Sequence, residues 1–251
     1  MKGKLNSNMQ TIQHKVLQEH ENDHWWFRVR RELVHDIIAQ YAKTSEHLAI
    51  ADIGCGEGGL AKEMERYGSV VGVDPSEEAL AFSRARGIKE LVQGSADKTN
   101  LPSATYDIVT CLDVLEHLSD ETPAIAEIER ILKPGGIAII FVPTFMFLWG
   151  ANDDASLHYR RYRLPAIVKK FTDAHFEILK HSYFNTFLFP PIALVRIVVR
   201  ALGLKTKPDF DMGNSVSNSL FYHIFTLERP LLRSIDLPFG VSAMVIARKP
   251  V

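Results

Sequence analysis

Two short stretches decide the fold of this chain: ADIGCGEGG at residues 51–59 and SVVGVD at residues 69–74. The pattern predicts a buried strand, a glycine loop, a helix and a second strand that ends in Asp74. Glycines let the loop turn tightly and approach a ligand closely. A carboxylate at the tip of the second strand can accept hydrogen bonds from both hydroxyls of a ribose. The two stretches therefore predict a pocket for a small molecule that contains adenosine.

The glycine spacing alone leaves two classes of adenosine ligand open. Gly54, Gly56 and Gly59 also satisfy G-x-G-x-x-G, and Asp74 lies where a dinucleotide site places its acidic residue, so a nicotinamide oxidoreductase is one interpretation. Asp52 disfavours it, because a carboxylate two residues before the first glycine suits a ligand with a free ammonium group. A pyrophosphate would instead require neutral amides there.

Later motifs favour the second class. YDIVTCLDVLEH at residues 106–117 predicts a strand that runs into a polar tip, and LKPGG at residues 132–136 ends a helix before the strand 137–142. With these motifs in this order and at this spacing, the chain resembles the class I S-adenosylmethionine-dependent methyltransferases. The resemblance covers residues 48–143 and extends more loosely to residue 182.

The resemblance implies S-adenosyl-L-methionine as the cofactor and S-adenosyl-L-homocysteine as the product. Asp52 and the backbone of the glycine loop would face the methionine part, Asp74 would hold the ribose, and residues 113–115 would line the floor below the sulfonium. The cofactor-binding residues implied in this way are Asp52, Gly54, Cys55, Gly56, Asp74, Pro75, Ala96, Asp97, Asp113, Val114 and Leu115.

The expected fold class is α/β, with a Rossmann-like, doubly wound, mostly parallel seven-stranded sheet, N-terminal helices and a helical insertion before the last strand. We expect one methyltransferase domain over residues 1–251, in which a further helix spans 9–20. At position 175, where the family usually has glycine after a helix, this chain has His175, so we expect some strain there. The predicted parts are a helical cap at 1–45, the S-adenosylmethionine-binding core at 46–183, the insertion at 184–239 and the last strand at 240–251.

Composition agrees with a globular enzyme. The chain has 251 residues, 46% of them hydrophobic and 24% charged, and a formal net charge of −1, so no basic field favours nucleic acid as a partner. The missing Asn-Pro-Pro-Tyr-like motif also disfavours nucleic-acid methylation.

Cys55 and Cys111 are expected to be small buried residues of a reducing compartment. No apolar stretch at the N-terminus is typical of a signal peptide, and we expect a cytoplasmic location.

The insertion has three open interpretations. Its most apolar part, residues 186–199, is interrupted by Pro190, Pro191 and Arg196 and is shorter than the ~20 apolar residues of a spanning helix. The segment 186–232 is predicted to pack on the sheet edge or on a second subunit in a homodimer, to form a substrate lid, or to make peripheral contact with a membrane.

The acceptor side is predicted from two aromatic and basic segments. The chain resembles a subgroup with His-Trp-Trp-Phe near the N-terminus, here at 24–27, and His-Tyr-Arg-Arg-Tyr later, here at 158–162. His158 and His117 are the candidate catalytic bases, because histidine can accept a proton near neutral pH. A structural role for both stays open. The candidate substrate-binding residues are Trp26, Phe27, Arg31, Trp149, Tyr159, Arg160 and Arg161.

These residues predict S-adenosylmethionine-dependent methyl transfer to an oxygen of a small-molecule or amphipathic acceptor. Arg160 or Arg161 would orient a carboxylate acceptor, which needs no base. A non-catalytic S-adenosylmethionine-binding subunit remains an alternative, as does a lipid-linked, peptide or nitrogen acceptor. No metal site is predicted, since Asp153 and Asp154 are adjacent acids that we expect to be solvated.

Overall fold

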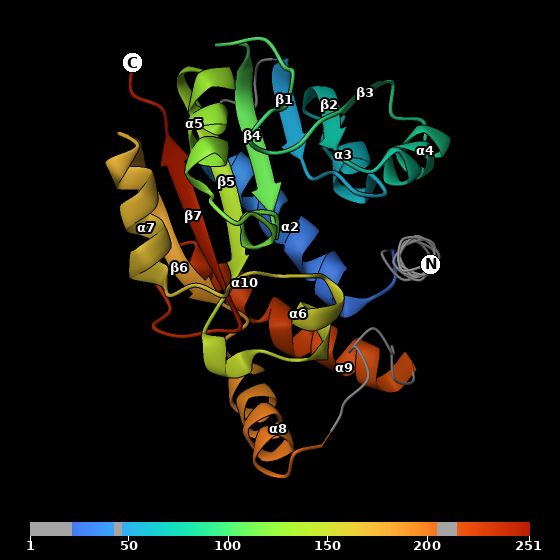
Figure 1. Cartoon of the computed structure of the whole chain (residues 1–251), viewed down its shortest axis with the longest axis vertical. Helices are drawn as coiled ribbons and strands as arrows, with labels where there is room; N and C mark the ends of the chain where they lie inside the picture. The colour runs from blue at the N-terminus through green and yellow to red at the C-terminus, as the bar shows by residue number, and fades with distance from the viewer. Residues whose placement is uncertain (1–21, 43–46, 205–214) are drawn as a thin grey trace.

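The computed structural model describes residues 22–42, 47–204 and 215–251, in which helices cover both faces of one sheet (Figure 1). The sheet has the order β3-β2-β1-β4-β5-β7-β6. The predicted seven-stranded fold is therefore confirmed. The strands are β1 (Leu48–Ile53), β2 (Gly68–Asp74), β3 (Glu90–Gln93), β4 (Tyr106–Leu112), β5 (Leu132–Pro143), β6 (Glu177–Phe184) and β7 (Ser242–Arg248).

Strands β1 to β5 run parallel, and β7 runs antiparallel between β5 and β6. Because the chain order reverses on either side of β1 and β4, the loops that follow these two strands diverge and leave a crevice at their carboxyl ends. The helices that accompany the strands are α2 (Trp25–Tyr41), α3 (Gly59–Met64), α4 (Glu77–Ala85), α5 (Thr122–Ile131) and α7 (Leu164–Asp173).

Two apolar layers hold the helices on the sheet. On one face, α5 and α7 bury side chains such as Ile128 and Phe171 against β1, β4, β5 and β7. On the other face, α2 buries Val29, Leu33, Val34, Ile37 and Ile38, which are the apolar positions of the amphipathic pattern. The sheet is thus covered on both sides, as a parallel sheet requires.

The predicted helix at 9–20 lies outside the described residues.

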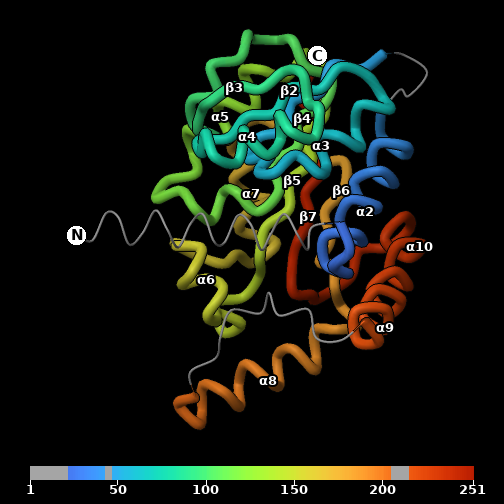
Figure 2. The backbone as a smooth tube through the Cα atoms, turned by 90° about the vertical axis from the view of Figure 1, so that its right-hand side faces the viewer, coloured from blue at the N-terminus to red at the C-terminus, as the bar shows by residue number. Residues whose placement is uncertain are grey.

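The insertion divides into two differently placed parts. Helices α9 (Ser215–Thr226) and α10 (Glu228–Leu232) lie against α2, where the Tyr222 hydroxyl donates to Glu32 at 2.8 Å and Arg229 pairs with Asp36 at 2.8 Å. Helix α8 (Phe189–Ala201) projects away from the sheet in both views (Figures 1 and 2). None of the described helices combines the length and the apolar character needed to cross a bilayer.

Three short helices complete the carboxyl edge of the sheet. They are η1 (Leu115–His117), directly after β4, and η2 (Met146–Leu148) and α6 (Ala151–Ala155), both after β5. An isolated bridge between Thr144 and Tyr162 returns the chain to the sheet after α6. The segment 145–162 is thereby folded over the ends of β4 and β5.

His175 follows α7 in the left-handed conformation, with φ 64°, which is the conformation that glycine adopts without a Cβ penalty. The Phe176 amide donates to the Phe171 carbonyl at 3.0 Å, which is the bond that closes this type of helix end.

We expect His175→Gly to raise the free energy of unfolding by about 0.5–1 kcal/mol, because glycine adopts positive φ without a Cβ penalty and the exposed imidazole loses little packing. Urea denaturation measures the change. In the control His181→Gly, an exposed position within β6, the same substitution should lower stability. Equal losses in both variants would show that no strain is relieved at residue 175.

Candidate functional site

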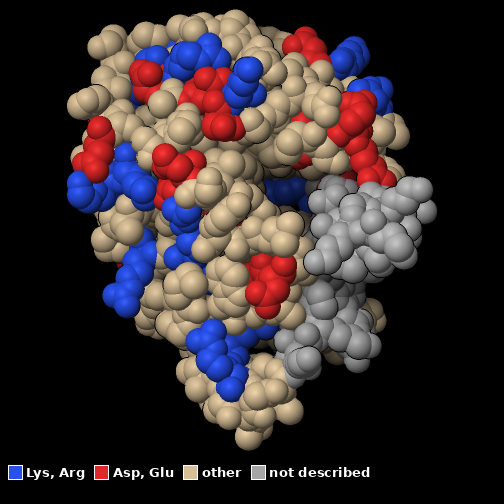
Figure 3. Space-filling view, viewed as in Figure 1, with Lys and Arg blue, Asp and Glu red and all other residues tan. Residues whose placement is uncertain are grey.

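The parallel register brings the ends of three strands to one edge. Asp52 on β1 lies opposite Thr110 on β4 and opposite Gly72 on β2. The residues that follow these strands, among them Gly54, Asp74 and Asp113, therefore meet at the same edge of the sheet. Figure 3 shows a hollow in this face with a basic side chain in its depth, where Figure 1 draws the ends of β1 and β4.

The glycine loop requires positive φ angles and, at Gly54, a residue without a Cβ atom. Gly54 has φ 74°, and a Cβ there would lie 2.3 Å from Cγ2 of Val114, so only glycine allows the loop to pack under the end of β4. Gly56 also has positive φ, 54°, but a Cβ there would meet no atom of the described residues within 4 Å. The loop is closed on the sheet side at Gly54 and open at Gly56, where a ligand can approach the backbone.

Two carboxylates flank this loop. Asp52 is buried and accepts a hydrogen bond from the Thr110 hydroxyl at 2.6 Å. Asp74 accepts from the Gly56 amide at 3.0 Å and from the Ser76 amide at 2.8 Å, one bond to each of its oxygens. A carboxylate oxygen can accept more than one hydrogen bond, so these two amide bonds do not by themselves prevent Asp74 from accepting bonds from ribose hydroxyls.

The other predicted cofactor residues lie around the same crevice. Pro75 follows Asp74 directly, whereas Ala96 is buried and Asp97 is exposed beyond β3, where Asp97 accepts a bond from the Ser95 hydroxyl. Burial raises the pKa of both thiols, Cys55 and Cys111. Both cysteines are therefore protonated and unreactive near neutral pH, as expected for small buried residues.

Asp113 meets a residue that sequence reasoning missed. It follows β4 with φ 53° and forms an ion pair with Arg30 of α2, whose side chain is 6% exposed. The Arg30 guanidinium also lies 5.0 Å from the Trp26 ring and 5.4 Å from the Phe141 ring. Helix α2 thus places the positive charge of Arg30 at the end of β4, and the two aromatic rings stabilise the guanidinium in that position.

The predicted substrate residues of the cap are placed differently. Arg31 pairs with Glu63 of α3 at 2.8 Å, whereas its neighbour Arg30 pairs with Asp113. That Arg31 binds a substrate stays a prediction. The Trp26 ring lies 6.0 Å from the Phe225 ring of α9 and supports Arg30, while Phe27 contacts the ring of His24. A helix turns about 100° per residue, so neighbouring arginines reach different partners.

Arg30→Lys is expected to lower the free energy of unfolding by about 1 kcal/mol, because lysine keeps the charge but loses the planar stacking on the two rings. The matched change Arg31→Lys should cost less, since Glu63 and Asp113 are exposed to a similar degree but only Arg30 lies over the Trp26 and Phe141 rings. Urea denaturation of both variants makes the comparison. Equal costs would mean that the aromatic contacts of Arg30 contribute nothing measurable.

A second polar cluster lies beyond Asp113. His158 Nδ1 lies 2.9 Å from Asp153 Oδ1, and its ring meets that of His117 edge-on, with centroids 4.5 Å apart. A carboxylate only accepts hydrogen bonds, so Nδ1 of His158 carries the proton in this bond, and Nε2 is the other ring nitrogen. Desolvation and the neighbouring His158 lower the pKa of His117, which keeps its imidazole neutral at pH 7.

Asp153 organises this cluster from the interior. It is fully buried, accepts two bonds from Arg161 at 2.8 and 2.9 Å, and accepts one from the Gly150 amide at 2.8 Å. Burial by itself raises the pKa of Asp153, but the bonds from His158 and Arg161 outweigh it and bring the pKa to about 2. The expectation that Asp153 is solvated is wrong, because α6 folds it inward; its neighbour Asp154 is exposed.

Glu116 lies between the two clusters. Its side chain is fully buried in η1, and neither carboxylate oxygen has a hydrogen-bond partner among the described residues. Burial and the nearby charge of Asp113 raise its pKa well above the usual range. Glu116 was not among the predicted site residues, although it lies within the Asp-Val-Leu-Glu-His motif at 113–117 that the sequence analysis singled out.

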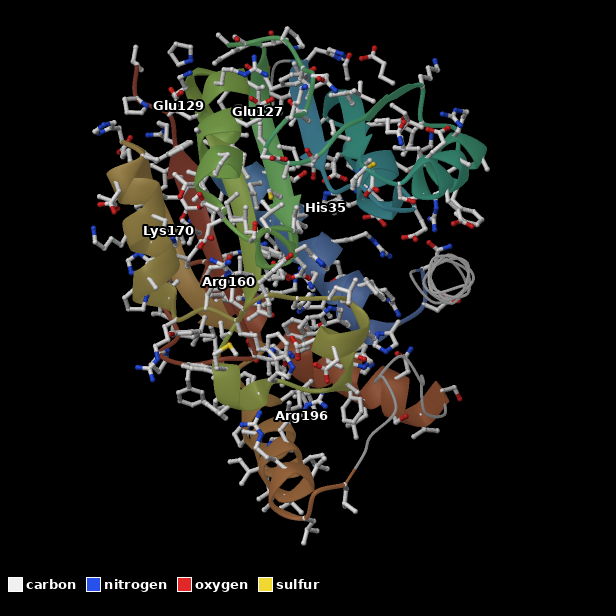
Figure 4. All side chains as sticks on the ribbon, in the orientation of Figure 1. His35, Glu127, Glu129, Arg160, Lys170 and Arg196 are labelled. Atoms are coloured by element: carbon white, nitrogen blue, oxygen red, sulfur yellow. The ribbon has the colours of Figure 1, made fainter. Side chains whose placement is uncertain are left out.

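The remaining predicted acceptor residues divide into two groups. Trp149 lies beside His158, with ring centroids 6.5 Å apart, whereas the Tyr159 side chain is exposed. The Arg160 guanidinium is held by Glu121, which also pairs with Lys170. Figure 4 labels Arg160 and Lys170. Arg161 is held by Asp153 and the Thr144 carbonyl. Both arginines thus have partners within the protein, and that one of them orients an acceptor stays a prediction.

Comparisons with known proteins agree with this arrangement. Residues 51–140 match a family described as a methyltransferase domain. A probable S-adenosylmethionine-dependent methyltransferase of Mycolicibacterium smegmatis is 28% identical over 162 residues, which are 62% of this chain and 61% of that protein. A ubiquinone biosynthesis O-methyltransferase of Aliivibrio fischeri is 37% identical over 94 residues, 35% of this chain and 40% of that protein.

A solved structure extends the likeness of fold. The cyclase SpnF matches 90% of this chain and 83% of its own, with a TM-score of 0.60 and 20% sequence identity. At this identity the match shows the fold alone. This chain spans 61% and 40% of the lengths of the two curated relatives.

The doubly wound fold, the open glycine loop and the two flanking carboxylates define a nucleotide-type cofactor site. Through the family match over residues 51–140 and these relatives, the chain is similar to the class I S-adenosylmethionine-dependent methyltransferases. S-adenosylmethionine is the cofactor of this class.

Proposed function

We propose that this protein transfers the methyl group of S-adenosylmethionine to an oxygen of a small or amphipathic acceptor. The observation that carries the proposal is the pair of neighbouring rings of His117 and His158 after β4, in which His158 is held by the buried Asp153. Asp52, Gly56 and Asp74 supply the cofactor half of the crevice. In this arrangement the acceptor lies between the sulfonium and the imidazoles.

Methyl transfer from S-adenosylmethionine requires few further groups from the protein. The methyl group is already activated by the sulfonium, so the site must hold the nucleophile in line with it and exclude water. A hydroxyl nucleophile must also lose its proton as the new O–CH3 bond forms and the S–CH3 bond breaks. His117 and His158 are the groups placed to receive that proton.

The ion pairs of the two later arginines favour a hydroxyl over a carboxylate acceptor. A carboxylate would need a cation with free donors, but Arg160 and Arg161 are bound to Glu121 and Asp153. Breaking the buried pair of Arg161 would leave Asp153 uncompensated, at a cost of about 3–5 kcal/mol.

An apolar surface beside the segment 145–162 supports an amphipathic acceptor. Met146 and Phe147 of η2 are exposed and adjoin α8, whose Arg196 guanidinium lies against Gly150. Contact of this surface with a membrane, or with a second copy of the chain, remains a prediction for residues 186–232. The exposed apolar side chains of α8 are Leu194, Val195, Ile197 and Val198.

Methyl transfer from radiolabelled S-adenosylmethionine to a panel of phenols, alcohols, carboxylic acids and amines tests the proposal. We expect label in a product that survives alkali, because an ether is stable to alkali whereas a methyl ester releases methanol. An amine product would overturn the assignment to oxygen. Binding of S-adenosylmethionine without transfer to any class would favour the non-catalytic alternative.

A further inference from the structure

We infer that Glu116, His117 and His158 form a binding site for a divalent first-row transition metal ion. One ligand atom from each of these side chains lies within 4.8 Å of the other two. The three residues come from η1 and from the segment after α6, which meet where the Tyr159 amide donates to the Glu116 carbonyl at 2.8 Å. The site is therefore assembled by two separate parts of the chain.

Glu116 provides the strongest reason to place a cation here. Its side chain is fully buried, and neither oxygen is hydrogen-bonded within the described part of the chain. A buried carboxylate without partners is costly, and native structures pair such groups or use them to coordinate metals. The adjacent charges are committed elsewhere, since Arg30 pairs with Asp113 and Arg161 pairs with Asp153.

The two histidines are prepared as ligands. Metal-binding histidines usually donate their second ring N–H to a carboxylate, which sets the tautomer and the direction of the ring. Asp153 accepts such a bond from Nδ1 of His158, which leaves Nε2 as the ring nitrogen that could bind a metal. His117 meets the ring of His158 edge-on and is the solvent-exposed member of the three, which leaves an approach for the ion.

The three ligand atoms must move only a short distance toward one another to bind one ion. Zinc lies about 2.0–2.1 Å from imidazole nitrogens, so ligands at tetrahedral corners are about 3.4 Å apart. A separation of up to 4.8 Å must therefore shrink by about 1.4 Å at most. Rotation of the exposed His117 side chain provides such a shift.

The donor set also selects the kind of metal. Two imidazoles and one carboxylate suit Zn²⁺, Fe²⁺ or Co²⁺, whereas Mg²⁺ and Ca²⁺ prefer oxygen ligands. Three protein ligands leave coordination positions open to solvent or substrate. The sequence predicted no metal site, and the two acids that it offered for a cation, Asp153 and Asp154, are not among these ligands.

The inference deepens the proposed function and rests on it in one respect only, the nature of the acceptor. A cation at this position would stabilise the deprotonated form of an acceptor hydroxyl, whose proton would pass to solvent. The two imidazoles would then serve as ligands of the cation, and this role would replace their role as proton acceptors. Binding of the metal itself does not depend on methyl transfer, so the two proposals can fail separately.

Calorimetric titration of the chelator-treated protein with ZnCl2 alone tests the site. We expect one ion per chain, with binding at least about 100-fold weaker in Glu116→Gln and in His158→Ala. Asp153→Asn should weaken binding about 10–100-fold, as is usual for a partner of a metal-bound histidine. His181→Ala, an exposed histidine on β6, is the matched control and should bind as the parent protein does.

Each variant must also bind S-adenosylmethionine, which shows that the domain is folded. The visible absorption of Co²⁺ gives a second readout, because nitrogen ligation in the parent should change its spectrum and His158→Ala should lose that change. No saturable binding, or Zn²⁺ binding that survives in both Glu116→Gln and His158→Ala, would overturn the site. Zn²⁺ binding without any methyl transfer would leave the site in place and contradict only the proposed function.

Discussion

Asp74→Ala is expected to weaken S-adenosylmethionine binding by about 100-fold or more. A hydrogen bond to a charged group contributes about 1.5–3 kcal/mol, and we expect this carboxylate to accept two from the ribose. Its oxygens also hold the Gly56 and Ser76 amides, so the substitution loosens the loop that the cofactor must approach. Calorimetric titration of the purified protein with S-adenosylmethionine measures the loss, with NAD as the competing ligand.

Two further variants separate the ribose contact from the shape of the loop. Asp74→Asn keeps one carbonyl oxygen as an acceptor and should lose less affinity than Asp74→Ala. Glu77→Ala, three residues later on the exposed start of α4, should bind as the parent protein does. If Asp74→Ala binds S-adenosylmethionine unchanged, or if the parent binds NAD instead, the assignment of the glycine loop to this cofactor is wrong.

Asp153→Asn should lower the free energy of unfolding by about 3–5 kcal/mol, because removing one partner of a buried ion pair leaves the other uncompensated. Here the partner is Arg161, whose side chain is 10% exposed. The asparagine would also lose a charged acceptor for His158 and for the Gly150 amide. Urea denaturation followed by circular dichroism measures the change.

The adjacent residue provides a matched control. Asp154 is exposed and accepts a hydrogen bond from the Trp149 indole at 2.9 Å, so Asp154→Asn should cost less than about 1 kcal/mol. Similar losses for the two variants would contradict the central role of Asp153. A large loss for Asp153→Asn alone would show that burial, rather than charge in this segment, decides the effect.

The contrast between these neighbours shows where sequence reasoning reached its limit. Asp153 and Asp154 are the same residue type in the same short helix, and no local pattern distinguishes them. Asp153 is buried because α6 turns it toward Arg161 and His158. Similarly, Arg30 and Arg31 differ by one helical position, and the packing of α2 on the sheet determines which of them reaches Asp113.

The fold and the cofactor loop were determined by the sequence itself, because their signals are local. Apolar runs and helical periodicity predict the strands and α2, and the glycines of residues 54–58 fulfil backbone demands within a few residues of one another. Only the tertiary structure decided the polar cluster of Glu116, His117, His158 and Asp153. Its members lie in separate segments, and their burial and orientation depend on how residues 145–162 fold over the ends of β4 and β5.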